Sequence, residues 1–243
     1  MTRIRYALGA CTFALLLWQG IVWLTGVPSF ILPSPLRVAQ AALDNRVLIA
    51  ENALVTATEV ILGLITGTVL GAFTAVQLAN SDRLHRLVMP LLIFTQAVPV
   101  FALAPILTLW FGYGIASKVV MAVLIIYFPV TSAFYDGLTR VPADILDMAK
   151  IMGGTKRQIM RRIKIPHALP SLGTGLKLAA VYAPIGAVIG EWVGASKGLG
   201  YLMLLANGRA KTDLMFASLF TLVVMTLLLS LAVTKASDHL SKP

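Results

Sequence analysis

Long apolar stretches alternate with short polar segments along the whole chain. Six of these stretches are long enough, or nearly so, to cross the hydrocarbon core of a bilayer, which is about 30 Å thick and takes a helix of about 20 residues. They lie at residues 6–25, 53–79, 87–110, 115–135, 170–192 and 213–234. The pattern therefore predicts an all-α, polytopic membrane protein with six transmembrane helices.

The longest polar segment, residues 136–169, separates the fourth and fifth predicted spans. In its first half, apolar residues recur with helical spacing at Ile145, Met148, Ala149 and Met152. Asp147 and Lys150 fall on the other side of that helix. The first half of the segment is therefore predicted to be an amphipathic helix.

A second short helix is predicted in the same segment. Gly153 and Gly154 end the first helix, and Thr155 with Gln158 three residues later indicates a capping box at the start of the next. Pro166 is expected to end it. A helical hairpin held at the membrane surface in this way can contact a soluble partner.

The charges orient the chain in the membrane. Of its 243 residues 58% are hydrophobic and 12% charged, and the net charge is +10. No nucleic-acid partner is expected, because the basic residues lie between apolar runs. Thirteen of the 20 Lys and Arg residues fall on the side that holds both termini and residues 136–169, and six fall on the other. By the positive-inside rule, both termini and that loop are cytoplasmic.

Residues 1–50 are expected to hold the first transmembrane helix and a segment on the outer face. The first apolar run follows basic residues, as in a signal peptide, but it is long and no A-x-A-like cleavage site precedes Pro28. After a proline-rich turn, residues 38–52 predict a surface helix. Residues 51–234 are expected to form the transmembrane domain, and residues 235–243 a cytoplasmic tail.

Two predicted spans carry glycine at every fourth position, at Gly63, Gly67 and Gly71 and at Gly186, Gly190 and Gly194. Small residues with this spacing let helix backbones approach closely. We expect them to pack helices within one subunit, with a dimer seam as the alternative. Prolines also interrupt the third, fourth and fifth spans, and the carbonyls they free are tolerated only against protein or a wet cavity. Such helices suit a pathway that must flex.

Few strongly polar groups lie at membrane depth, where a charge costs about 2.5–3.5 kcal/mol on insertion scales. Glu191 ends the fifth span, Glu59 lies in the second, and Gln96 lies beside Pro99 in the third. We expect all three polar residues to face the translocation pathway. A structural cap, or an ion pair with Lys197, is the alternative role for Glu191.

The sequence offers neither a nucleotide-binding nor a metal-binding motif of the common enzyme types. It lacks a G-x4-G-K-[ST] phosphate loop and an H-E-x-x-H metal motif. Its single cysteine, Cys11, excludes an intramolecular disulfide. We therefore expect no catalytic residue, no metal site and no cofactor in this chain.

The polar segment resembles the EAA loop of bacterial ABC-importer permeases, whose consensus is E-A-A-x3-G-x9-I-x-L-P. The sequence follows this consensus in register at Asp147-Met-Ala149, Gly153 and Ile163-Lys-Ile-Pro166. It has Asp in place of Glu, Met in place of the first Ala, and Ile in place of Leu. The alternative is a basic amphipathic loop that lies on anionic membrane lipid.

The resemblance covers residues 50–234 and implies a type I ABC-importer transmembrane domain with a six-helix core, in a bacterial cell inner membrane. It implies a homodimer, two copies of a separate ABC ATPase subunit that bind ATP and the 136–169 loops, and a periplasmic or lipid-anchored substrate-binding protein. It assigns coupling to the ATPase to Asp147, Ala149, Gly153, Ile163 and Pro166.

Two further segments, residues 96–114 and 190–203, resemble the nitrate, sulfonate and taurine branch of that family. Within it they are similar to permeases for the thiamine precursor hydroxymethylpyrimidine. The second span carries Glu59 and no internal Arg, where anion importers are expected to carry one, which favours a neutral or weakly basic solute. The alternatives are a sulfonate, taurine, nitrate or riboflavin-type ABC permease.

Two other classes of membrane protein are weaker explanations. A stand-alone secondary transporter or channel would need inverted repeats, and no second copy of the 87–110 pattern occurs. A membrane anchor for a soluble partner would need the polar loop but not the kinked, glycine-lined spans.

The charge distribution makes a prediction about topology. In a Cys11→Ser background, a cysteine introduced at Ser81 or Thr155 should be shielded from an impermeant thiol reagent added to intact cells. A cysteine at Ser196 should react, because it lies on the side with fewer basic residues. Gel shifts of the labelled protein measure both, and labelling of Thr155→Cys from outside would overturn the orientation.

Overall fold

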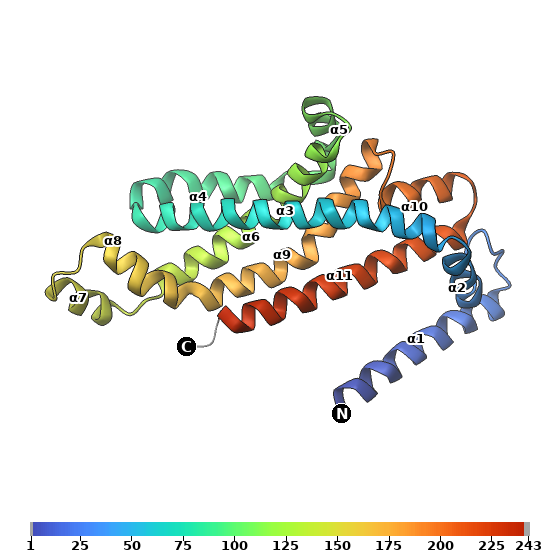
Figure 1. The fold of residues 1–243 in the computed structure, drawn as a ribbon, viewed down its shortest axis with the longest axis horizontal. Coiled ribbons are helices and arrows are strands. Elements are labelled where there is room, and N and C mark those ends of the chain that lie inside the picture. The colour runs from blue at the N-terminus through green and yellow to red at the C-terminus, as the bar shows by residue number, and fades with distance from the viewer. Residues whose placement is uncertain (1, 241–243) are drawn as a thin grey trace.

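The computed structural model of the chain describes residues 2–240 and shows an elongated bundle of helices (Figure 1). The predicted all-α architecture is confirmed for that part of the chain. The elements are α1 Thr2–Thr25, α2 Pro35–Asp44, α3 Arg46–Asn80, α4 Asp82–Ala97, α5 Val100–Phe111, α6 Ile115–Thr139, α7 Ala143–Ile151, α8 Lys156–Ile159, the π-helical turn η1 Met160–Lys164, α9 Ile165–Gly194, α10 Leu199–Gly208 and α11 Thr212–Leu240. Residues 241–243 of the expected tail lie outside the described residues.

Helix α6 lies at the centre of the bundle, packed against both α3 and α9. The first glycine row faces it from α3. A Cβ atom at Gly63 would lie 2.5 Å from Cβ of Ala122, and one at Gly67 would lie 2.7 Å from Cδ1 of Ile126. Both distances are too short for carbon atoms, so glycine is required for this approach of the two helices.

Two glycines of the second row face α6 from α9, and the third, Gly194, faces Tyr113 and Thr108 near the end of α5. A Cβ atom at Gly186 would lie 2.6 Å from Cα of Ala122, and one at Gly190 would lie 2.9 Å from Cγ of Lys118. The expectation that the glycine rows pack helices within one subunit is therefore confirmed. The space beside these glycines is filled by buried apolar side chains of all three helices, namely Val60, Ile126, Val130, Ala179, Ala183 and Ala187.

The predicted six spans are matched only in part. Among the described residues, four helical segments are long and apolar enough to cross a membrane, and a fifth is reached if α4 and α5 count as one span. Those two helices diverge by 100° around Pro99, so the third predicted span is a broken one. The first predicted span falls within α1, which runs from Thr2 to Thr25.

The prediction of one surface helix over residues 38–52 is wrong. α2 ends at Asp44 and α3 already begins at Arg46. The break occurs at Asn45, whose backbone leaves the helical conformation and whose side-chain amide donates to the carbonyl of Ala41, 2.9 Å away. The backbone N–H of Asn45 donates to the same carbonyl at 3.1 Å, so this residue caps the end of α2 with two donors.

The prediction that Pro166 ends a helix is also wrong. α8, η1 and α9 form one continuous helical segment, Lys156–Gly194, and Pro166 lies in the first turn of α9. Proline lacks an N–H donor and its ring crowds the carbonyl of the fourth residue before it. The π turn immediately before Pro166 shifts the hydrogen-bond register there, so the helix continues.

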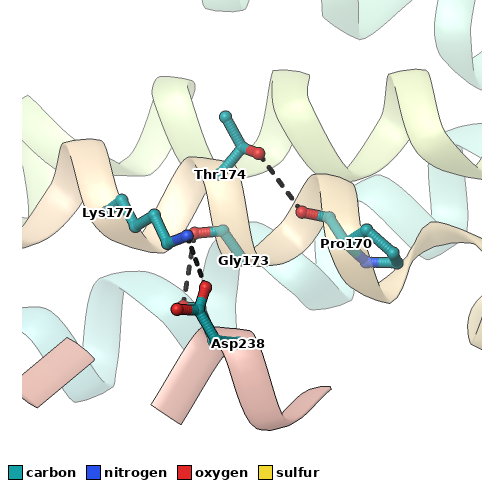
Figure 2. Close-up of polar contacts among 6 residues, drawn as sticks. Pro170, Gly173, Thr174, Lys177 and Asp238 are labelled. Carbon is teal, nitrogen blue, oxygen red and sulfur yellow. Dashed lines mark hydrogen bonds and ion pairs between the residues drawn. The ribbon is translucent and has the colours of Figure 1, made fainter. Parts of the chain in front are cut away.

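An ion pair joins α9 to the end of α11. Nζ of Lys177 lies 2.8 Å from Oδ1 of Asp238 (Figure 2). Both side chains are substantially exposed, so the pair contributes about 0–1 kcal/mol. On the same turn of α9, the Thr174 hydroxyl donates to the carbonyl of Pro170, which gives that hydroxyl a partner within its own helix.

The close packing of α6 and α9 can be tested by substitution. Gly186→Ala should lower the free energy of unfolding by about 1–3 kcal/mol, because the added Cβ meets backbone atoms of α6 that cannot move aside. Gly20→Ala in α1 is the control, since nothing lies within 4 Å of its Cβ position. Reversible unfolding in detergent micelles measures the stability of both variants. If Gly186→Ala were as stable as the unchanged protein, this packing would be contradicted.

Candidate functional site

The predicted helical hairpin extends from one end of the bundle as α7 and α8 (Figure 1). None of the residues of α7 is buried. Its apolar side chains are instead presented to the outside, at Ile145, Met148 and Ile151, together with the C-cap residue Met152. Ile151 and Met152 are 86% and 80% exposed. A helix with this many uncovered large apolar groups has the surface of a docking element.

The turn between α7 and α8 depends on two glycines. Gly153 adopts φ +80°, which L side chains rarely adopt, although nothing lies within 4 Å of its Cβ position. Its N–H donates to the carbonyl of Lys150, and the N–H of Gly154 donates to the carbonyl of Ala149, both at 2.9 Å. These two bonds form a Schellman motif that satisfies the last carbonyls of α7.

The predicted capping box at Thr155 is confirmed. The hydroxyl of Thr155 accepts from the N–H of Gln158 at 3.3 Å, and the side-chain carbonyl of Gln158 accepts from the N–H of Thr155 at 2.8 Å. Unlike α7, the segment that follows is anchored, because Ile159 and Met160 are buried at the base of the bundle. The hairpin therefore has an anchored second helix and an uncovered first one.

The five residues expected to couple to an ATPase occupy different parts of this hairpin. Asp147 is exposed and pairs with Lys150 at 2.7 Å. Ala149 and Gly153 build the turn described above. Ile163 is half-buried in η1, and Pro166 is exposed at the start of α9. The structure thus places the first three on or beside the uncovered helix and the last two where the hairpin joins the membrane span.

The three polar residues expected on the pathway do not lie together. Gln96 is exposed at the C-terminal end of α4, just before the bend at Pro99. Glu59 of α3 and Glu191 of α9 are buried, 3% and 1% exposed, and their carboxyl groups are neighbours. Whether any of the three contacts a solute stays a prediction.

Sequence reasoning missed three partners of this buried pair. Lys118 is 1% exposed in the first turn of α6, close enough to interact electrostatically with both carboxyl groups. Asn52 and Thr56 of α3 are also buried. A signal for the last two was present, because Asn52, Thr56 and Glu59 continue the stripe of Gly63, Gly67 and Gly71 along one helix face.

The alternative role of Glu191 as a cap is seen in the structure. One carboxylate oxygen accepts from the Thr56 hydroxyl at 2.6 Å, and the other accepts from the backbone N–H of Gly200 at 2.5 Å. Lys197 is exposed, and no ion pair with Glu191 occurs among the side chains that the structure describes. Among the same side chains, no cluster of three His, Cys, Asp or Glu residues is arranged to hold a metal ion.

Comparison with known proteins places these features in a family. Residues 67–242 match the family model described as "Binding-protein-dependent transport system inner membrane component". A probable ABC transporter permease protein of Haemophilus influenzae is 47% identical over 215 residues, 88% of each chain. The formylaminopyrimidine transport permease protein ThiX of Halalkalibacterium halodurans is 37% identical over 99% of this chain and 97% of its own.

Two further similarities concern solute and fold. The riboflavin transport system permease protein RibX of Chloroflexus aurantiacus is also 37% identical, over 88% of this chain and 81% of its own. A chain of the MetNI methionine ABC transporter, solved in an inward-facing conformation, superposes with a TM-score of 0.72 at 20% identity, covering 82% of this chain and 99% of that one. This last similarity shows the type I importer fold. The chain belongs to the family of binding-protein-dependent inner membrane components, the permease subunits of ABC importers.

Proposed function

We propose that two copies of this permease form the membrane channel of an importer, with both termini in the cytoplasm. Each α7–α8 hairpin seats in a separate ATPase subunit, and a periplasmic or lipid-anchored binding protein delivers solute at the opposite end. The single observation that supports this arrangement most is the uncovered apolar face of α7, beside a helix that is anchored in the bundle. A loop lying on anionic lipid would not need the fixed turn at Gly153.

ATP is bound and hydrolysed by the partner subunit in this proposal, and this chain holds no cofactor. Closure of the two ATPase subunits moves the hairpins, and the membrane helices change between inward-facing and outward-facing packings. ATP shifts the populations of these packings because the partner binds one of them more tightly. Asp147 and Ala149 contact the ATPase, Gly153 sets the turn, and Ile163 and Pro166 join the hairpin to α9.

We infer that the solute is a thiamine precursor of the pyrimidine class. The permease named for formylaminopyrimidine transport aligns with almost the whole chain. The absence of an Arg from α3 near Glu59 also favours a neutral or weakly basic solute over a sulfonate, taurine or nitrate. Riboflavin transport is the second candidate, because the riboflavin permease is equally identical over a shorter alignment.

The turn at Gly153 tests the coupling proposal. Gly153→Val should abolish uptake while the protein still inserts, because a β-branched residue at φ +80° forces the hairpin into another shape. Gly153→Asn is the matched control and should keep most of the uptake, since Asn tolerates this conformation. Uptake and co-purification of the ATPase are measured together, and full uptake by Gly153→Val would refute the assignment.

Growth tests the solute. A strain that cannot make the pyrimidine moiety of thiamine should need this permease when it is fed low concentrations of hydroxymethylpyrimidine or formylaminopyrimidine. Re-expression of the chain should restore growth, whereas the Gly153→Val variant should not. Equal growth of the deletion strain, together with loss of riboflavin, taurine or sulfonate use, would reject the pyrimidine and leave the importer assignment intact.

A further inference from the structure

The short helix α10 receives its N-terminal caps from other helices. The backbone N–H of Gly198 donates to the side-chain oxygen of Asn52, and that of Leu199 donates to the hydroxyl of Thr56, both at 2.8 Å. The N–H of Gly200 donates to the carboxylate of Glu191. Two of the acceptors belong to α3 and one to α9.

These caps replace one that α10 cannot supply for itself. The first N–H groups of any helix lack partners within the helix, and usually a side chain at the N-cap position accepts from one of them. Here the N-cap is Gly198, which has no side chain. Because the acceptors are all buried, an N–H left without its partner at this place would find no water to replace it.

Two glycines make room for the carboxylate. Gly198 adopts φ +117°, and a Cβ there would lie 2.3 Å from Cδ of Glu191. A Cβ at Gly200 would lie 2.7 Å from Oε2 of the same residue. The acceptor oxygens of Glu191 also lie at the positive end of the α10 dipole, where an electron-rich group is favoured. The Thr56 hydroxyl, which donates to Glu191, closes the network between α3 and α9.

We propose that Glu191 and Thr56, supported by Asn52, are positioning residues for transport that hold α10 in register with α3 and α9. α10 lies at the end of the bundle opposite the α7–α8 hairpin (Figure 1). The network makes this helix move with the two spans, so that the far end of the molecule changes shape whenever α3 and α9 separate or approach. The role in transport rests on the proposed importer function, whereas the fixing of α10 does not.

Hydrogen exchange of the full chain in lipid nanodiscs tests the positioning directly. Thr56→Val and Glu191→Leu remove acceptors while keeping the side-chain shape, so amide exchange in residues 198–203 should accelerate about tenfold. Thr56→Ser and Glu191→Gln each keep an acceptor oxygen and should stay within about threefold of the unchanged protein. Thr58→Val is the control on the same helix, because the Thr58 hydroxyl bonds only within α3.

Uptake is measured on the same variants. Thr56→Val and Glu191→Leu should lower the maximal rate of uptake without changing the solute KM, and the two conservative variants should restore it. Unchanged exchange in residues 198–203 of both Thr56→Val and Glu191→Leu would overturn the proposal. So would loss of uptake by Glu191→Gln with exchange intact, because Glu191 would then act through its charge and not by fixing α10.

Thr56→Val removes a single hydroxyl, so amide exchange in this variant tests the positioning of α10 by itself if Glu191→Leu does not insert. If no uptake of any tested solute is found, the importer proposal fails at the growth test, while exchange in residues 198–203 still reports whether the network fixes α10.

Discussion

The structure depends on the close contact that α6 makes with α3 and α9 through glycine. Without a hydrophobic effect between helices in lipid, packing at short range must supply much of the attraction. Gly63 and Gly186 approach α6 at the same residue, Ala122, from two sides. This contact sets where the polar stripe of α3 meets the end of α9. It also fixes the base from which the α7–α8 hairpin extends, because α6 and α9 carry the two ends of that hairpin.

Local patterns in the sequence predicted the local parts of this fold. Hydrophobic runs identified the long helices, and glycine at every fourth position identified the helix faces in contact. The Thr155 capping box and the turn at Gly153 were also predicted, because each is defined by residues a few positions apart. The same short-range spacing carried the resemblance to the permease family. Short-range patterns of residues were therefore sufficient to predict the class of protein.

Features that join distant segments, or that depend on backbone geometry, could not be predicted. Thr56 and Glu191 are 135 residues apart, and nothing in either neighbourhood indicates the other. Proline also had two different outcomes. Pro99 begins α5 after a 100° bend, whereas Pro166 lies inside a continuous helix because a π turn precedes it. Ile159 and Met160 are buried at this turn, but the sequence of the turn itself does not reveal its hydrogen-bond register.

The π turn before Pro166 has a mechanical consequence. Because the helix does not break there, the 39 residues from Lys156 to Gly194 form one continuous helix, about 58 Å long at about 1.5 Å per residue. A continuous helix passes a displacement along its length, even with Pro170 and Pro184 inside it, while a hinged loop would absorb it. A displacement applied at its hairpin end can therefore reach Glu191 through a single helix. The chain would need no relay of intermediate contacts to carry a signal across the membrane.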